Sequence, residues 1–125
     1  MLQIFLIMLI FILISYIINL RNDNNFGQKQ IAIYLNISRR DYCNIEVGRR
    51  KLNIDEAIKL CYLYGKSFEY ICGYINDDSI LLNVDMDCTI KVLKKLNVDI
   101  EYYHELRSIV IKNNEILKKV TQGKF

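Results

Sequence analysis

No proline interrupts this chain of 125 residues, and only five glycines are present. Proline and glycine are the residues that most often end helices and form the turns of β-hairpins. Their scarcity, with apolar residues recurring three and four positions apart, favours helices and argues against a β-sandwich or barrel. We therefore expect an all-α fold. A chain of this length has room for one small domain and an appendage.

The cysteines and histidine do not indicate a disulfide scaffold or a metal site. Cys43, Cys61, Cys72 and Cys88 are scattered through apolar helical patterns without C-x-x-C spacing. The single histidine, His104, does not complete a zinc-binding set with them. Glycine-rich phosphate loops are also absent from the sequence. We expect no catalytic residues, no metal and no cofactor, so the chain is not expected to be an enzyme.

Two short helices separated by a tight turn are predicted between residues 28 and 46. The first covers residues 28–35 and is followed by Asn36, a residue type that tolerates the left-handed conformation. Ser38 is a favourable N-cap for the second helix, which runs to Glu46 before Gly48. Helix, short turn and helix in this order is the plan of a helix-turn-helix motif.

A third and a fourth helix are predicted to follow. Asn53 and Glu56 have the spacing of a capping box, which opens a helix that ends at Gly65. A last short helix runs from Ser67 to Gly73. The polar stretch at residues 75–79 then separates this region from the rest of the chain.

Residues 75–125 are predicted to form a helical tail. Asp87 is the expected N-cap of a helix through Leu96, and Asp99 caps a longer helix to about Val120. The longer helix carries residues that alternate three and four positions apart, Tyr103, Leu106, Val110, Asn113, Leu117 and Val120. This heptad-like seam covers fewer than three heptads, so it either packs within the chain or joins two copies in a homodimer.

Residues 12–74 resemble the Cro and phage-repressor type of helix-turn-helix domain, often called the XRE family. The resemblance is carried by the segments from Gln28 to Ser38 and from Asn44 to Lys51. It continues at Ile54, Leu60, Leu63, Gly65, Ser67, Ile71 and Gly73. The resemblance implies the five-helix lambda-repressor-like fold, with a first helix near residues 12–23.

The same resemblance implies a DNA-reading surface. It places Arg39, Arg40 and Asn44 where members of the family contact base edges in the major groove. Arginine can bond guanine O6 and N7, and asparagine can bond adenine N6 and N7. The residues implied to contact phosphates or the nearest bases are Gln28, Ser38, Arg49, Arg50 and Lys51. Five cations lie between residues 39 and 51, as expected of a phosphate-contacting surface, although a solvated helix face has the same composition.

One ion pair and three departures complete the comparison with the family. Arg21 and Glu46 occupy the positions of a partly buried structural salt bridge. Gly27 replaces the usual Ser or Thr cap of a helix, Tyr42 replaces a core Ile or Val, and Leu52 stands where proline is common. None of these three changes removes a DNA-facing group.

Seventeen of the first 20 residues are apolar. A segment of this length and composition is sufficient for a membrane span. The segment lacks the basic start and small-residue cleavage site of a secretory signal. The resemblance needs Ile17 and Leu20 in the core, and residues 1–11 alone would form a helix of only about 17 Å. A hydrocarbon layer is about 30 Å thick. We therefore expect residues 1–11 to be a hydrophobic extension upstream of the native start, with a membrane-tethered regulator as the alternative.

The sequence thus predicts a cytoplasmic protein that binds double-stranded DNA and regulates transcription, as a repressor of the phage or mobile-element type. A homodimer is expected because paired half-sites multiply the specificity of one recognition helix. Two alternatives stay open. One is an antitoxin-like or adaptor protein that binds a protein partner through residues 99–120. The other is the membrane-anchored regulator, with its C-terminal side in the cytoplasm.

Overall fold

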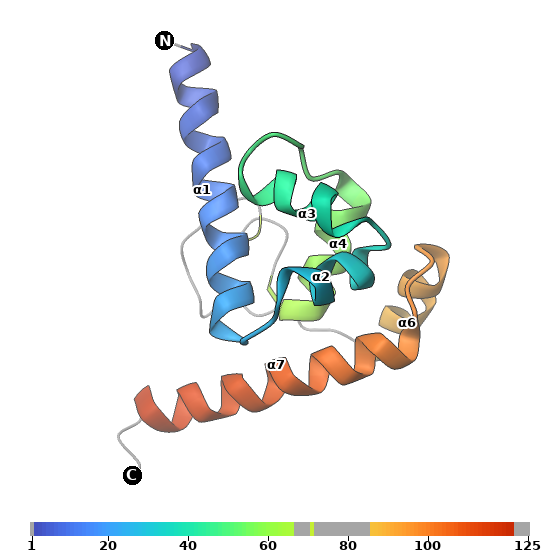
Figure 1. The fold of residues 1–125 in the computed structure, drawn as a ribbon. Coiled ribbons are helices and arrows are strands. Elements are labelled where there is room, and N and C mark those ends of the chain that lie inside the picture. Colours follow the sequence, from blue (N-terminus) through green and yellow to red (C-terminus); the bar gives the residue numbers. More distant parts are fainter. Residues whose placement is uncertain (1, 67–70, 72–85, 122–125) are drawn as a thin grey trace.

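The computed structural model describes residues 2–66, 71 and 86–121 (Figure 1), and the side chains of these residues except 5–13 and 120–121. Over this part of the chain the structure is helical and has no β-strand, so the predicted all-α class is confirmed. The helices are α1 (Leu2–Asp23), α2 (Gln28–Leu35), α3 (Arg39–Glu46), α4 (Ile54–Tyr64), α6 (Met86–Lys95) and α7 (Ile100–Thr121).

The predicted caps hold the first helices in place. Asn36 ends α2 in the left-handed region with a φ of 59°. The Ser38 hydroxyl accepts a hydrogen bond from the Asp41 N–H at 3.0 Å and so begins α3. Asn53 Oδ1 accepts from the Glu56 N–H at 2.8 Å, while Glu56 Oε1 accepts from the Asn53 N–H at 3.0 Å. This reciprocal pair is the predicted capping box, and it begins α4.

Gly65 ends α4 at the point where the tail crosses it. Its φ of 69° is a left-handed value that favours glycine. Arg107 of α7 lies directly over this turn and donates from Nη1 to the carbonyl oxygen of Leu63 at 3.0 Å. A Cβ atom at residue 65 would lie 2.9 Å from Arg107 Nη2. Glycine therefore provides both the turn and the space for the arginine that satisfies a carbonyl near the end of α4.

The remaining predicted helices are found with small differences. The prediction that Asp87 caps a helix is wrong, because α6 begins at Met86 and Asp87 already lies in its first turn. Asp99 does cap α7, since its Oδ1 accepts the N–H of Glu101 at 3.1 Å. The helix predicted at residues 67–73 lies outside the described residues, apart from Ile71, which is buried.

One hydrophobic core joins the first four helices to the tail. Leu93, Leu106 and Val110 of the tail are at most 1% exposed and belong to the same cluster of buried side chains as α1–α4. The Tyr103 ring of α7 stacks on the Tyr34 ring of α2, with centroids 6.2 Å apart. The N-terminal half of the predicted seam on α7 therefore packs within the chain rather than against a second copy.

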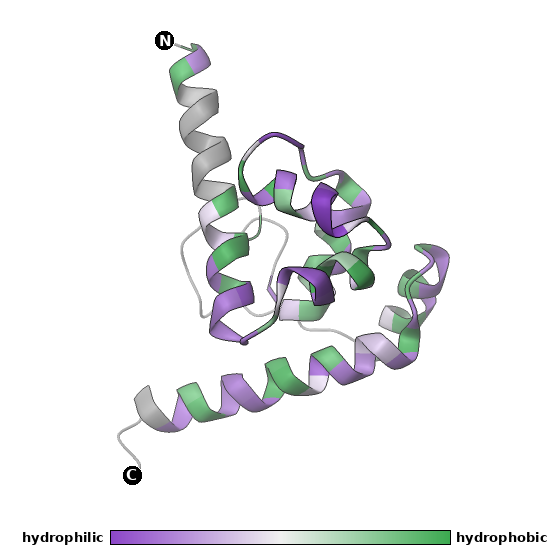
Figure 2. Ribbon diagram, in the orientation of Figure 1, coloured by the Kyte–Doolittle hydropathy of each residue, from purple (hydrophilic) through white to green (hydrophobic). Residues whose placement is uncertain are grey.

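α7 lies across one end of the bundle (Figure 1) and shows alternating hydrophobic and hydrophilic bands along its length (Figure 2). Asn113, the polar position of the predicted seam, donates from Nδ2 to Asn24 Oδ1 at 3.0 Å. Ile109 and Ile116 lie on the solvent side and are exposed. The helix thus has one face on the core and a second, partly apolar face in solvent.

α1 packs against the body through its C-terminal part, and its N-terminal part projects away (Figure 1). Ile17 and Leu20 are 1% and 8% exposed and lie in the core, as the resemblance required. Leu2 and Ile4, near the other end, are exposed. When only the residues with described side chains are considered, no helix is both long and apolar enough to cross a membrane.

Candidate nucleic-acid interface

α3 contains several hydrophilic residues (Figure 2), and those of its first turn are exposed. Arg39, Arg40 and Asp41 in its first turn are exposed, and Asn44 one turn later is half-buried. Within the described part of the chain, neither arginine side chain takes part in a hydrogen bond or an ion pair. Both guanidinium groups are therefore available to an acceptor outside the protein.

The inner face of α3 is fixed in the core. Tyr42 and Ile45 are 0% and 2% exposed, and Glu46 is 9% exposed. Arg40 and Asn44, four residues apart, lie on the opposite side of α3, and Arg39 is exposed in its first turn. The orientation of these side chains is therefore set by the packing of α3 rather than by the exposed residues themselves.

The Glu46 carboxylate joins α1, α2 and α3. Arg21 of α1 donates from Nε to Oε2 at 2.7 Å and from Nη2 to Oε1 at 3.0 Å. The Tyr42 hydroxyl donates to Oε2 at 2.6 Å, and Gln28 Nε2 donates to Oε1 at 3.0 Å. Arg21 also donates from Nη1 to the carbonyl oxygen of Phe26 at 2.9 Å. The structural ion pair expected between Arg21 and Glu46 is present and is bidentate.

The hydrogen bonds of this network determine the charge of its members. Burial alone would raise the pKa of Glu46, but hydrogen bonds from Arg21, Tyr42 and Gln28 outweigh it and the pKa lies below its ordinary value. The hydrogen bond to Glu46 likewise raises the pKa of Arg21. Burial raises the pKa of Tyr42, so its hydroxyl stays protonated and continues to donate. The network is therefore an ionised pair with a neutral phenol at neutral pH.

Gln28 lies between α2 and α3 rather than fully in solvent. Its Nε2 donates to Glu46, and its Oε1 accepts from Cys43 Sγ at 3.1 Å. The side chain is half-buried. Gln28, which the sequence predicted to contact DNA, therefore forms hydrogen bonds to two side chains of α3 in this structure.

The segment after α3 bends back over the end of the helix. Gly48 has a φ of 83°, and the N–H groups of Arg49 and Arg50 donate to the Asn44 carbonyl oxygen at 2.8 and 3.1 Å. This turn leaves Arg49 and Lys51 exposed beside α3. Two of the three predicted phosphate contacts in this segment are thus accessible.

Arg50, the third of these residues, is engaged inside the protein. It donates from Nη1 to both carboxylate oxygens of Glu56, at 3.0 and 3.1 Å. The Glu56 side chain is 4% exposed and the Arg50 side chain 31%. The sequence assigned Glu56 only to a capping box, because nothing in the spacing shows that one carboxylate can serve both a helix end and an arginine six residues earlier.

The predicted site residues fall into two groups. The first group is exposed or half-buried on α3 and the segment after it, and consists of Arg39, Arg40, Asn44, Arg49 and Lys51. Ser38, Gln28 and Arg50 are used to build the surface, through a helix cap, the Glu46 network and the pair with Glu56. Sequence reasoning missed Asp41, an exposed carboxylate in the first turn of α3.

Comparison of the chain with protein-family models, curated proteins and solved structures gave no match. The function of this surface is therefore inferred from its own residues and geometry.

Proposed function

We propose that this protein binds double-stranded DNA with sequence specificity through α3 and regulates transcription, as a repressor of the phage or mobile-element type. The observation that carries the proposal is the outer face of α3, where Arg39 and Arg40 are exposed and unpaired in the described structure while the inner face is buried. An α-helix with its side chains is about 10–12 Å across, which fits the major groove of about 12 Å.

Base recognition follows from the donors on this face. Arg39 and Arg40 each present a planar fork that suits guanine O6 and N7, and the Asn44 amide suits adenine N6 and N7. The Asp41 carboxylate adds an acceptor, which can accept a hydrogen bond from the N4 amino group of cytosine. Each good bidentate contact discriminates against a wrong base by about 1–3 kcal/mol.

Phosphate contacts would surround this face. The first N–H groups of α3, which follow Ser38, point out of the helix, and its dipole favours an anion there. Arg49 and Lys51 extend the positive surface beyond the other end of α3. These groups carry no base information, but they fix the position of α3 on the duplex.

The proposal includes a fold family and a location in the cell. α2, the turn at Asn36 and α3 would be the helix-turn-helix, and α1, α4 and the helix predicted at residues 67–73 would complete the five-helix lambda-repressor-like domain. The Glu46 network supports this, since it joins α1 to the end of α3 as the resemblance implies. A transcriptional regulator of this kind would act in the cytoplasm.

We include a homodimer in the proposal because a single α3 reads few base pairs. The solvent face of α7 is the surface available to a second copy, with exposed apolar side chains at Ile109 and, seven residues on, Ile116. A separate protein partner, as expected for an antitoxin or adaptor, would use this same face, because the N-terminal half of the other face of α7 is buried in the core.

The test is selection of duplexes by the full chain from a random DNA pool, repeated at several salt concentrations. We expect a short sequence to be enriched, arranged as an inverted repeat with half-site centres about 10 base pairs apart if two copies bind. Enrichment of a single half-site would contradict the homodimer. Recovery of a pool without any enriched sequence would contradict sequence-specific binding.

A further inference from the structure

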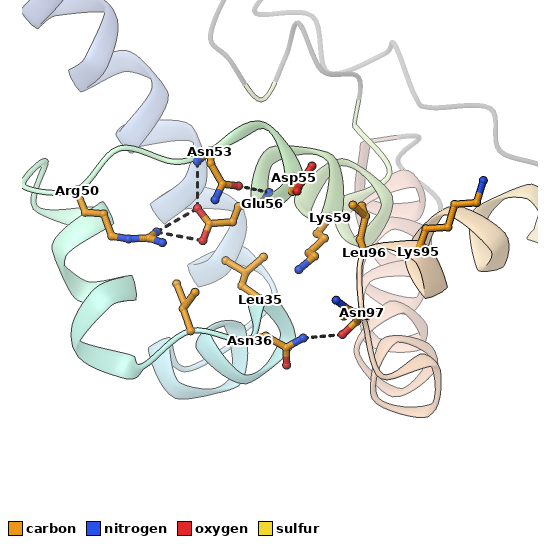
Figure 3. Close-up of a pocket in the computed structure, with 11 residues that line it drawn as sticks. Leu35, Asn36, Arg50, Asn53, Asp55, Glu56, Lys59, Lys95, Leu96 and Asn97 are labelled. Carbon is orange, nitrogen blue, oxygen red and sulfur yellow. Dashed lines mark hydrogen bonds and ion pairs between the residues drawn. The ribbon is translucent and has the colours of Figure 1, made fainter.

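A polar cavity of about 320 Å³ lies between segments that are far apart in the sequence (Figure 3). The turn between α2 and α3 contributes Asn36, the first half of α4 contributes Lys59, and the turn between α6 and α7 contributes Asn97. Asn36 donates from Nδ2 to the Asn97 carbonyl oxygen at 2.5 Å and closes one side. The cavity therefore exists only where the tail meets the turn that precedes α3.

Lys59 is the residue of this cavity whose charge is not accounted for. Only 6% of Lys59 is exposed, and its amino group points into the space beside Leu35 and Asn97 (Figure 3). In the described part of the chain this amino group has neither a hydrogen bond nor an ion pair. The amino group itself reaches accessible space, because among the described residues the one fully buried side-chain N or O atom without a hydrogen bond is Tyr64 Oη. The Lys59 amino group is therefore open to an anion that enters the cavity.

The other charges around the cavity do not supply that partner. Arg50 and Glu56 neutralise each other through their two hydrogen bonds. Asp55 is exposed and forms no ion pair with Lys59, and Lys95 directs its amino group away from the cavity (Figure 3). Among the described residues of the cavity, the Lys59 amino group is thus a cation that points into the space without a partner.

We propose that this cavity binds a small polar anion, a molecule with a carboxylate or phosphate group that pairs with Lys59. The side-chain amides of Asn36 and Asn97 line the same space and offer donors and acceptors to the hydroxyl or amide groups of such a molecule. The volume is at the lower end of the range of about 300–1,000 Å³ for small-molecule sites, which suits a small metabolite. A bound molecule contacts the turn before α3 and the tail at the same time.

Thermal unfolding of the full chain tests this site. Lys59→Met removes the ammonium group and keeps a side chain of similar length, and Lys94→Met changes an exposed lysine of α6 outside the cavity. Each protein is measured at pH 7 in sodium phosphate, sodium succinate and sodium chloride of equal ionic strength. We expect at least one of the two anions to raise the Tm of the unmodified chain and of Lys94→Met by about 3 °C over chloride, since ligands that bind only the folded state stabilise it. Lys59→Met loses this rise.

A second measurement locates the ligand and does not depend on the folding of any variant. Titration of the isotope-labelled chain with the same anions should shift the backbone amide resonances of Asn36 and Asn97. A response to phosphate alone identifies a phosphate ligand, and a response to succinate alone identifies a carboxylate ligand. Absence of any response, or an equal rise in Tm for Lys59→Met, overturns the site. No DNA is present, so this result is independent of the proposed DNA binding.

Discussion

Glu46 shows how much of the candidate interface depends on one carboxylate. Its two oxygens accept four hydrogen bonds from three side chains, which belong to three different helices. Removing one partner of a buried ion pair typically costs about 3–5 kcal/mol, because the other charge is left buried and unpaired. In this protein that charge would be Arg21, whose side chain is 13% exposed.

The first prediction concerns stability in acid. Because the pKa of Glu46 is lowered in the folded state, its contribution is fully present above the unfolded-state pKa of about 4.3. That contribution is lost as the pH falls from about 5 through the folded-state pKa. We expect Glu46→Gln to lower the free energy of unfolding by about 3 kcal/mol at pH 7 and to flatten the pH dependence below about pH 5. Urea unfolding at a series of pH values measures both, and parallel curves for the two proteins would disprove the ionised pair.

Several of these residue contacts could be anticipated only in part from the sequence. The Arg21 and Glu46 pair was expected from a family resemblance, but Tyr42 registered only as an unusual core residue. In the structure its ring is fully buried and its hydroxyl reaches Glu46, so the extra size is accommodated by a hydrogen bond. At Gly27, the missing side-chain cap is partly replaced by Gln30 Oε1, which accepts the Gly27 N–H at 2.8 Å. Such contacts depend on side-chain conformation, which spacing does not encode.

At the scale of the element, α3 and the segment after it carry different expected roles. Arg39→Ala should reduce affinity for the selected sequence by about 5- to 150-fold and relax the preference at one base pair. Arg49→Ala should weaken binding to all sequences alike and reduce the slope of log affinity against log salt by about one. Fluorescence anisotropy with matched and mismatched duplexes separates the two. An equal loss on every duplex for Arg39→Ala would refute its role in base recognition.

The helix ends were the part of each element that the sequence predicted well. Ser38, Asn53 and Asp99 act as caps through local hydrogen bonds, and local chemistry is readable from neighbouring residues. The start of α6 was misplaced by two positions, because a carboxylate such as that of Asp87 is favourable both at the cap and within the first turn. For α7 the apolar seam was predicted, but the partner of that seam was not.

At the scale of the molecule, the tail is part of the folded core. We expect Leu106→Ala, at a site 1% exposed, to lower the free energy of unfolding by about 2–5 kcal/mol. Ile111→Ala, five residues on, 42% exposed and not one of the two residues named for a second copy, is the matched control and should change it by about 0.5 kcal/mol or less. Urea unfolding followed by circular dichroism measures both values. Equal effects of the two changes would mean that α7 does not contribute to the core.

The arrangement of the tail could not be derived from the sequence because it depends on contacts between distant segments. Asn36 and Asn97 each end a helix in the left-handed conformation, and their meeting 61 residues apart creates the cavity beside Lys59. No local pattern relates these positions. For α1, in contrast, the sequence left two possibilities, a membrane span or a first helix with Ile17 in the core. Ile17 is buried in the core, so the C-terminal part of α1 packs against the body of the protein.

The most direct measurement is the affinity of the full chain for its selected duplex and for a scrambled duplex of the same composition. It is made alongside the Arg39→Ala and Arg40→Ala double variant at several salt concentrations. We predict that the unmodified chain prefers the selected duplex by about 1,000-fold or more. The double variant should lose at least about 25-fold of that preference while its Tm is unchanged, because both side chains are exposed. Equal affinity of both proteins for both duplexes would contradict a DNA-reading role for α3.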